Sequence, residues 1–139
     1  MSQTEKLLYT AKVRTTGGRE GGTSRSDDGR LDIKHSVPGA PGNGTNPEQL
    51  FAAGWSACFE SAMTIASRKK KITLPADLAI DAEVDLNTNE GGYFLRGRLK
   101  VTVPGVDRQV SQSIVDIAEQ LCPYSKAIRG NVDVSITLV

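Results

Sequence analysis

The feature that most constrains the fold is one long, mostly apolar segment near the centre of the chain. Thr45-Asn46-Pro47-Glu48 carries the signals of a helix start, because Thr or Asn can cap a helix and Pro fits its first turn. Glu48 also suits the positive end of the helix dipole. The pattern predicts a helix to about Ser67, followed by a basic run at 68–71 that suits the negative end. Apolar residues lie on nearly every face, so we expect burial on most sides, partly by a partner subunit.

The segment after this helix alternates as a half-buried strand does. Leu78, Ile80, Ala82, Val84 and Leu86 are separated by polar positions, three of them acidic: Asp81, Glu83 and Asp85. After a turn at 87–92, a second strand points its apolar residues inward and its basic ones outward: Arg96, Arg98 and Lys100. An acidic row would then face a basic row across a hairpin, which helps to fix the strand register.

The remaining elements complete an α+β pattern. We expect a first strand at 7–16, short strands near 23–26 and 30–35, a turn at 38–44, and a closing strand at 131–139. A second, amphipathic helix is expected at about 107–121, with these residues on one side: Val110, Ile114, Ile117, Ala118 and Leu121. The order of elements predicts a largely antiparallel sheet, and the length of 139 residues predicts one domain, 1–139.

Charge and composition argue against several classes of function. The net charge of +1 gives no electrostatic footprint for nucleic acid or a membrane. No apolar run reaches the roughly 18 residues of a membrane span, and the start of the chain lacks a secretion signal, so we expect a cytoplasmic location. His35 is the only histidine, which is too little for a histidine-based metal site, and we expect it on a strand surface.

Two cysteines carry the candidate chemistry. Cys58 lies in the apolar run 50–59, where a cysteine is most often an inert core residue. Reactivity requires the thiolate, and burial raises a thiol pKa, so a cation must lie nearby. Arg19, on a glycine-rich loop at 17–22, is the most unusual candidate, although a solvated loop arginine is the simpler interpretation. Cys122 either ends the second helix or caps a short one beginning at Pro123, where the helix dipole would favour its thiolate. Periodicity therefore does not say which cysteine attacks.

Glu48 is interpreted most simply as a capping carboxylate. Ten helical residues separate it from Cys58, about 15 Å along the axis, so its side chain cannot reach that cysteine within one helix. If both serve one site, either Arg19 bridges them or they come from different subunits.

Other familiar motifs are missing from the sequence. It contains no phosphate-binding GxxxxGK[ST] loop and no CxxC exchange motif. The stretch 54–58 has cysteine where a hydrolase nucleophile elbow needs its second glycine.

Two motifs in order resemble those of the organic hydroperoxide resistance proteins, which share a superfamily with the osmotically inducible protein C. The first is the run 46–59, Asn-Pro-Glu-Gln-Leu-Phe-Ala-Ala-Gly-Trp-Ser-Ala-Cys-Phe, and the second is Leu-Cys-Pro-Tyr-Ser-Lys-Ala at 121–127. The resemblance covers essentially the whole chain, including the loop at 16–21. It implies a fold of largely antiparallel sheets around a central buried helix, assembled as an intertwined homodimer with active sites at the interface.

The resemblance also implies roles for individual residues. Cys58 is similar to the peroxidatic cysteine, Cys122 to the resolving cysteine, Arg19 to the arginine that activates the thiolate, and Glu48 to the carboxylate that orients it. No bound metal or cofactor is implied, and the reductant would be dihydrolipoamide or a lipoylated protein. Apolar neighbours expected to favour alkyl hydroperoxides are Phe51, Trp55, Phe94 and Tyr124.

Three functions stay open at this point. The sequence favours a thiol peroxidase that reduces organic and fatty-acid hydroperoxides through a Cys58 sulfenic acid and an intramolecular disulfide. A general peroxidase of the wider superfamily would share the chemistry with broader peroxide use. A stoichiometric redox sensor is the alternative outside enzymes, and no recognisable DNA-binding element supports it.

Overall fold

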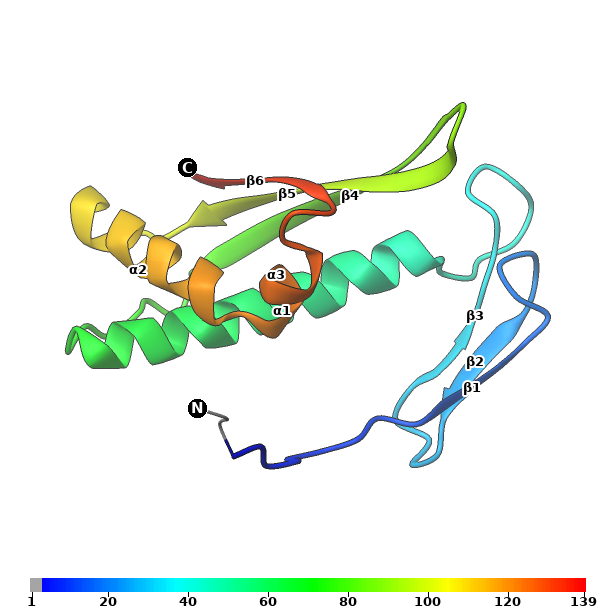
Figure 1. Cartoon of the computed structure of the whole chain (residues 1–139), viewed down its shortest axis with the longest axis horizontal. Helices are drawn as coiled ribbons and strands as arrows, with labels where there is room; N and C mark the ends of the chain where they lie inside the picture. Colours follow the sequence, from blue (N-terminus) through cyan, green and yellow to red (C-terminus); the bar gives the residue numbers. More distant parts are fainter. Residues whose placement is uncertain (1–3) are drawn as a thin grey trace. The chain divides into compact units, whose positions relative to one another are not determined.

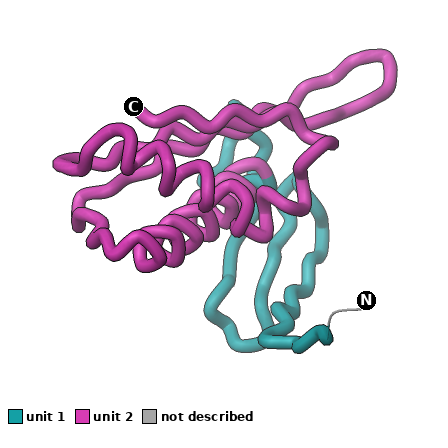
Figure 2. Tube along the Cα trace, turned by 60° about the vertical axis from the view of Figure 1, so that its left-hand side comes forward, with its two compact units in different colours: residues 1–47 teal, residues 48–139 magenta. Residues whose placement is uncertain are grey.

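The computed structural model describes residues 4–139 as two compact units, one ending at Pro47 and the other spanning Glu48–Val139 (Figure 2). Three strands are followed by a long helix, two strands, two helices and a final strand, and each unit holds a three-stranded sheet (Figure 1). The α+β class expected from the sequence is confirmed. A single domain over residues 1–139 stays a prediction.

The first unit holds a small antiparallel sheet of strands β1 (Val13–Thr16), β2 (Thr23–Ser26) and β3 (Asp32–Lys34), in that order. The strand expected at 7–16 is therefore shorter than predicted. Its partner β2 ends at Ser26, which lies opposite Val13, so the ladder has no further partner strand there. The preceding apolar residues are left at least 75% exposed in the single chain: Leu7, Leu8 and Tyr9.

His35 corrects a prediction, because it is buried rather than on a strand surface. It follows β3 and is only 6% exposed. Its Nε2 lies 2.7 Å from Ser24 Oγ, and Ser24 Oγ lies 2.7 Å from Thr15 Oγ1. Its backbone N–H donates to the Gly22 carbonyl at 2.8 Å. Hydrogen-bonded polar side chains, Ser24 and His35, are therefore the buried residues of this small sheet. Hydropathy alone did not reveal this.

The second unit packs helices against a larger sheet. Helix α1 (Pro47–Lys69) is followed by β4 (Ala79–Asn89), β5 (Gly92–Thr102), α2 (Arg108–Leu121), α3 (Pro123–Ile128) and β6 (Asp133–Leu138). The sheet order is β4-β5-β6, with β4 and β5 antiparallel and β6 parallel to β5. Helix α2 begins where predicted, because the Asp107 side chain accepts the Val110 N–H at 3.1 Å as its N-cap.

The predicted charge pairing of the hairpin is confirmed in register. Asp81 lies opposite Lys100, Glu83 opposite Arg98, and Asp85 opposite Arg96. The Arg98 guanidinium also donates two hydrogen bonds, of 2.7 and 2.8 Å, to the diagonal neighbour Asp85. Its Nε donates to Glu83 at 2.9 Å. Arg98 lowers the pKa of both carboxyls by hydrogen bonding to them.

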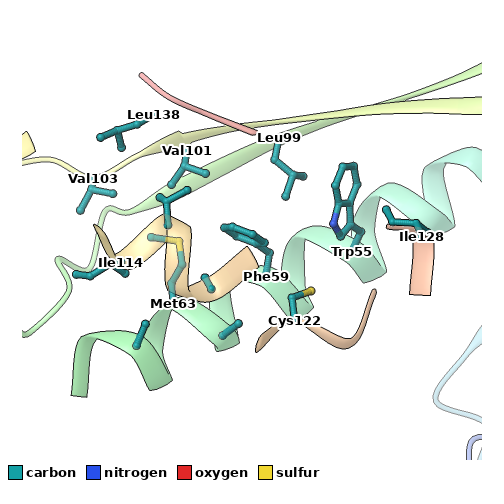
Figure 3. Packing of buried hydrophobic residues seen from close by; sticks show 14 residues of the cluster. Trp55, Phe59, Met63, Leu99, Val101, Val103, Ile114, Cys122, Ile128 and Leu138 are labelled. Carbon is teal, nitrogen blue, oxygen red and sulfur yellow. The ribbon is translucent and has the colours of Figure 1, made fainter. Parts of the chain in front are cut away.

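The hydrophobic core lies between α1, α2 and the inner face of this sheet (Figure 3). Fully buried members include Trp55, Phe59 and Met63 of α1, Leu99 and Val101 of β5, and Ile114 of α2. In the single chain α1 is buried along one side only. The opposite side exposes Ala53, Ala57 and Ile65, so burial on most sides is not reached by this chain alone.

Candidate active site

The two cysteines, 64 residues apart in sequence, meet in the second unit. Cys58 lies in the middle of α1 and is half-buried, whereas Cys122 lies at the junction of α2 and α3 and is fully buried. Both are free thiols, and their Sγ atoms are 3.4 Å apart. A disulfide requires about 2 Å, so the two sulfurs are close to, but not within, bonding distance.

Both interpretations of Cys122 left open by the sequence are correct. Its backbone N–H donates to the Ala118 carbonyl at 2.9 Å and so ends α2. Its own carbonyl accepts the Lys126 N–H at 3.0 Å and so begins α3, with Pro123 in the first turn. Because Pro lacks an N–H and fixes φ, it suits the first position of a helix and forces the chain to turn there. The turn brings the Cys122 side chain into the core beside α1 (Figure 3).

The electrostatics around Cys58 mainly oppose ionisation. Burial raises the pKa of the Cys58 thiol above its ordinary value, and the nearby Cys122 thiol raises it further. The backbone N–H of Tyr124 acts the other way, since it hydrogen-bonds to the Cys58 side chain and lowers its pKa. This donor was not predicted from the sequence. The signal that could have found it is Pro123, which starts a helix whose first free N–H groups follow Cys122 directly.

Three of the four predicted aromatic neighbours cluster beside the cysteines. The Phe51 ring meets the rings of Trp55 and Tyr124 edge-on, each at a centroid distance of 6.1 Å. Trp55 is fully buried in the core, where its Nε1 donates to Ser125 Oγ at 3.3 Å, whereas Tyr124 is 39% exposed. Phe94 lies elsewhere, on β5, where the Arg96 guanidinium stacks 5.5 Å from its ring centroid.

Arg19 and Glu48, the two charged residues predicted to activate Cys58, are both half-buried. Arg19 is half-buried on the turn between β1 and β2, where Gly17 and Gly18 adopt the positive φ values of +77° and +63° that glycine tolerates best. Glu48 is half-buried in the first turn of α1, which runs without a break through Cys58. Glu48 and Cys58 are therefore ten residues apart on one continuous helix, as predicted from the sequence.

Residues 4–139 contain no group of three or more His, Cys, Asp or Glu side chains arranged to hold a metal ion. Within the same residues, no helix combines the length and apolar character needed to cross a membrane.

Comparisons with known proteins agree with the resemblance seen in the sequence. The profile of the OsmC-like protein family matches residues 40–137. The chain is 49% identical to the organic hydroperoxide resistance protein of Xanthomonas axonopodis pv. citri, over 99% of both chains. It is also 41% identical to the organic hydroperoxide resistance protein OhrB of Bacillus subtilis, over 94% of this chain and 98% of that one.

Solved structures give the same result. The crystal structure of Bacillus subtilis OhrB superposes with a TM-score of 0.89 at 43% identity, covering 96% of this chain and 100% of that one. An organic hydroperoxide resistance protein from Elizabethkingia anophelis superposes with a TM-score of 0.88 at 40% identity, covering 96% and 98%. The chain belongs to the OsmC-like family, within its group of organic hydroperoxide resistance proteins.

Proposed function

We propose that this protein is a thiol peroxidase that reduces organic hydroperoxides, including fatty-acid hydroperoxides, to alcohols. The observation that carries the proposal is the separation of 3.4 Å between Cys58 Sγ and Cys122 Sγ, two free thiols in a mostly apolar setting. The relatives are named for resistance to organic hydroperoxides, which supports this substrate class.

The proposed cycle uses one sulfur to attack and the other to resolve. The Cys58 thiolate attacks the peroxide oxygen, so an S–O bond forms, the O–O bond breaks, and the alkoxide leaves as alcohol after taking a proton. Cys122 then attacks the Cys58 sulfenic acid, forming the disulfide and releasing water. An external dithiol, dihydrolipoamide or a lipoylated protein, reduces the disulfide by exchange and is itself oxidised.

Accessibility supports this division of roles. Cys58 is half-buried, so a small substrate can approach its sulfur, whereas Cys122 is fully buried and is suited to react only with its neighbour. The apolar rings of Phe51 and Tyr124 beside Cys58 would favour alkyl over hydrogen peroxide through hydrophobic burial. Of the other two aromatic residues predicted for this pocket, Trp55 would act from the core, whereas Phe94 lies on β5 beside Arg96.

Activation of Cys58 needs more than its immediate neighbours provide. Because burial raises the pKa of this thiol, a cation must favour the thiolate. We assign this role to Arg19, with Glu48 holding the guanidinium through paired hydrogen bonds so that its charge is fixed in place. The same charge would stabilise the negative charge that develops on the departing oxygen.

A homodimer completes the proposal. Exposed apolar residues on the outer side of α1 and in the segment 7–9 are surfaces that a second copy would cover. Active sites would lie at the interface, and the protein would work in the bacterial cytoplasm without a bound cofactor.

The test compares two serine variants. Cys58→Ser should abolish consumption of cumene hydroperoxide with dihydrolipoamide as reductant. Cys122→Ser should keep the first oxidation but convert Cys58 to sulfinic acid, a gain of two oxygen atoms detectable by mass spectrometry. Loss of the first oxidation in Cys122→Ser would reverse the two assignments.

Substrate comparison separates the remaining alternatives. A much higher kcat/KM for cumene hydroperoxide than for hydrogen peroxide is expected; equal values would favour a general peroxidase. A single equivalent of oxidation without turnover in the presence of dihydrolipoamide would favour a stoichiometric sensor.

A further inference from the structure

Gly54 lies in the interior of α1, where glycine is a poor choice for helix stability. A Cβ built at this position would clash with the Tyr124 hydroxyl and lie 2.9 Å from Cζ and 3.3 Å from Cε2 of the same ring. Real side-chain contacts do not approach this closely, so any other residue at 54 must displace Tyr124. The absence of a side chain at 54 is what lets the ring lie directly on the backbone of α1.

The same ring is linked to both cysteines. Tyr124 follows Cys122 by two residues in the first turn of α3, and Cys122 Sγ lies 3.4 Å from Cys58 Sγ. The Tyr124 backbone N–H also lowers the pKa of the Cys58 thiol. Gly54 precedes Cys58 by one helical turn, so the ring covers the side of α1 on which that sulfur lies. Phe51, three residues before Gly54, meets the same ring edge-on, with the two ring centroids 6.1 Å apart.

We propose that Gly54 is a positioning residue, whose bare backbone seats the Tyr124 ring and thereby holds the start of α3, with Cys122, beside the Cys58 sulfur. Gly54 touches no reacting atom and acts through Tyr124. The biological meaning of this role rests on the proposed function. The role itself can be tested on disulfide formation between the two thiols alone.

The alternative is that Gly54 only allows α1 and α3 to pack. A substitution would then lower the melting temperature without changing the chemistry of the two thiols. Because alanine favours helix more than glycine does, a site with no close neighbour would even gain stability. The two interpretations therefore differ in what happens to the cysteines.

A double-mutant cycle distinguishes them. The cycle compares four proteins: the unchanged protein, Gly54→Ala, Tyr124→Ala and the double variant. The measured quantity is the rate of disulfide formation on addition of diamide. Diamide takes up the two electrons and two protons that the thiols lose. This readout needs no peroxide, so it stands apart from the test of peroxidase activity. Gly91→Ala, a glycine in the β4–β5 turn without positive φ, is the matched control for an added methyl group.

Gly54→Ala should slow disulfide formation at least about 10-fold, since misplacing a reacting group by about 1 Å can cost on the order of 100-fold. The pH profile of alkylation at Cys58 should also move to higher pH, because the Tyr124 N–H no longer lies at the sulfur. In the Tyr124→Ala background, the same Gly54→Ala change should alter the rate less than about 2-fold, because the clashing ring is gone. Gly91→Ala should match the unchanged protein.

Two results would overturn the proposal: wild-type disulfide kinetics in Gly54→Ala, or equal slowing by Gly54→Ala in both backgrounds. If Gly54→Ala alone does not fold, the Tyr124→Ala background decides. There, a double variant that forms the disulfide as fast as Tyr124→Ala supports the proposal, and a slower one refutes it.

Discussion

The two sheets of this molecule have the same number of strands but are stabilised in different ways. Every buried apolar side chain of the described residues lies in the second unit, between Trp55 and Leu138. The first unit instead buries Ser24 and His35, which hydrogen-bond to each other. One sheet is therefore held by a hydrophobic core and the other by a short chain of polar contacts.

The difference matters because the two kinds of contact have different strengths. Burying a large apolar side chain contributes about 1.5–3 kcal/mol, whereas a typical hydrogen bond contributes a net of about 0.5–1.5 kcal/mol. A sheet whose strands have only three or four residues and no apolar core of its own depends on other surfaces for its stability. The small sheet is thus the part of the chain most dependent on its surroundings.

The proposed chemistry follows the same division. The thiol pair lies where packing is dense, so its sulfur separation is fixed by the core around Cys122. The proposed activating cation, Arg19, lies on a turn of the small sheet, outside that core. Reaction geometry and thiolate activation can therefore be perturbed separately.

The largest effect should come from the core of the large sheet. Leu99 is fully buried on β5, so Leu99→Ala should lower the free energy of unfolding by about 2–5 kcal/mol through lost burial and a cavity. Ile33, half-buried on β3, should cost less than about half as much when changed to Ala. Urea unfolding followed by circular dichroism measures both. Equal losses would show that the small sheet has a hydrophobic core after all.

The polar interior of the small sheet gives the next effect. Ser24→Ala removes the partner of His35 Nε2 in a buried site, where Nδ1 has no partner either, and should cost about 1–3 kcal/mol of unfolding free energy. Thr23→Ala is the matched control, because its hydroxyl meets Thr16 Oγ1 at 3.4 Å on the exposed face. A cost for Thr23→Ala as large as for Ser24→Ala would contradict a special role for the buried contact.

Arg19→Ala tests whether the small sheet contributes to the chemistry of the large one. Loss of the proposed activating cation should raise the pKa of Cys58, since an opposite charge favours the ionised form. The thiolate fraction at neutral pH then falls, and the midpoint of the alkylation profile moves to higher pH. Arg14→Ala, on β1 of the same sheet, should leave the profile in place. An unmoved profile in Arg19→Ala would remove Arg19 from the mechanism.

Local patterns predicted what depends on neighbours in sequence. Charge alternation predicted the register of β4 and β5, capping residues predicted the start of α1, and an amphipathic pattern predicted α2. The thiol pair was different, since periodicity only marked the two cysteines as unusual. Their partnership came from the resemblance, and the structure adds the separation that periodicity does not encode.

What could not be predicted depends on residues that meet across long sequence separations. Nothing near Gly54 indicates that a ring 70 residues later will lie on it. His35 sits in a polar stretch that is typical of an exposed strand, and only the meeting with Ser24 and Thr15 makes it an interior residue. The length of β1 depends on where β2 ends, which the apolar run at 7–9 does not show.

The smallest effect should come from the exposed charges of the large sheet. Arg98 lowers the pKa of Glu83 and Asp85 mainly by hydrogen bonding, so their contribution to stability is present above about pH 5 and is lost as pH falls through their lowered values. Arg98→Met should therefore make the loss of unfolding free energy between about pH 5 and pH 2 less steep, in urea titrations at each pH. Arg14→Met is the comparison from the small sheet, because Arg14 lies opposite another cation, Arg25, and should leave the slope unchanged. An unchanged slope in Arg98→Met would mean that these solvent-exposed charges order the hairpin register without stabilising the fold.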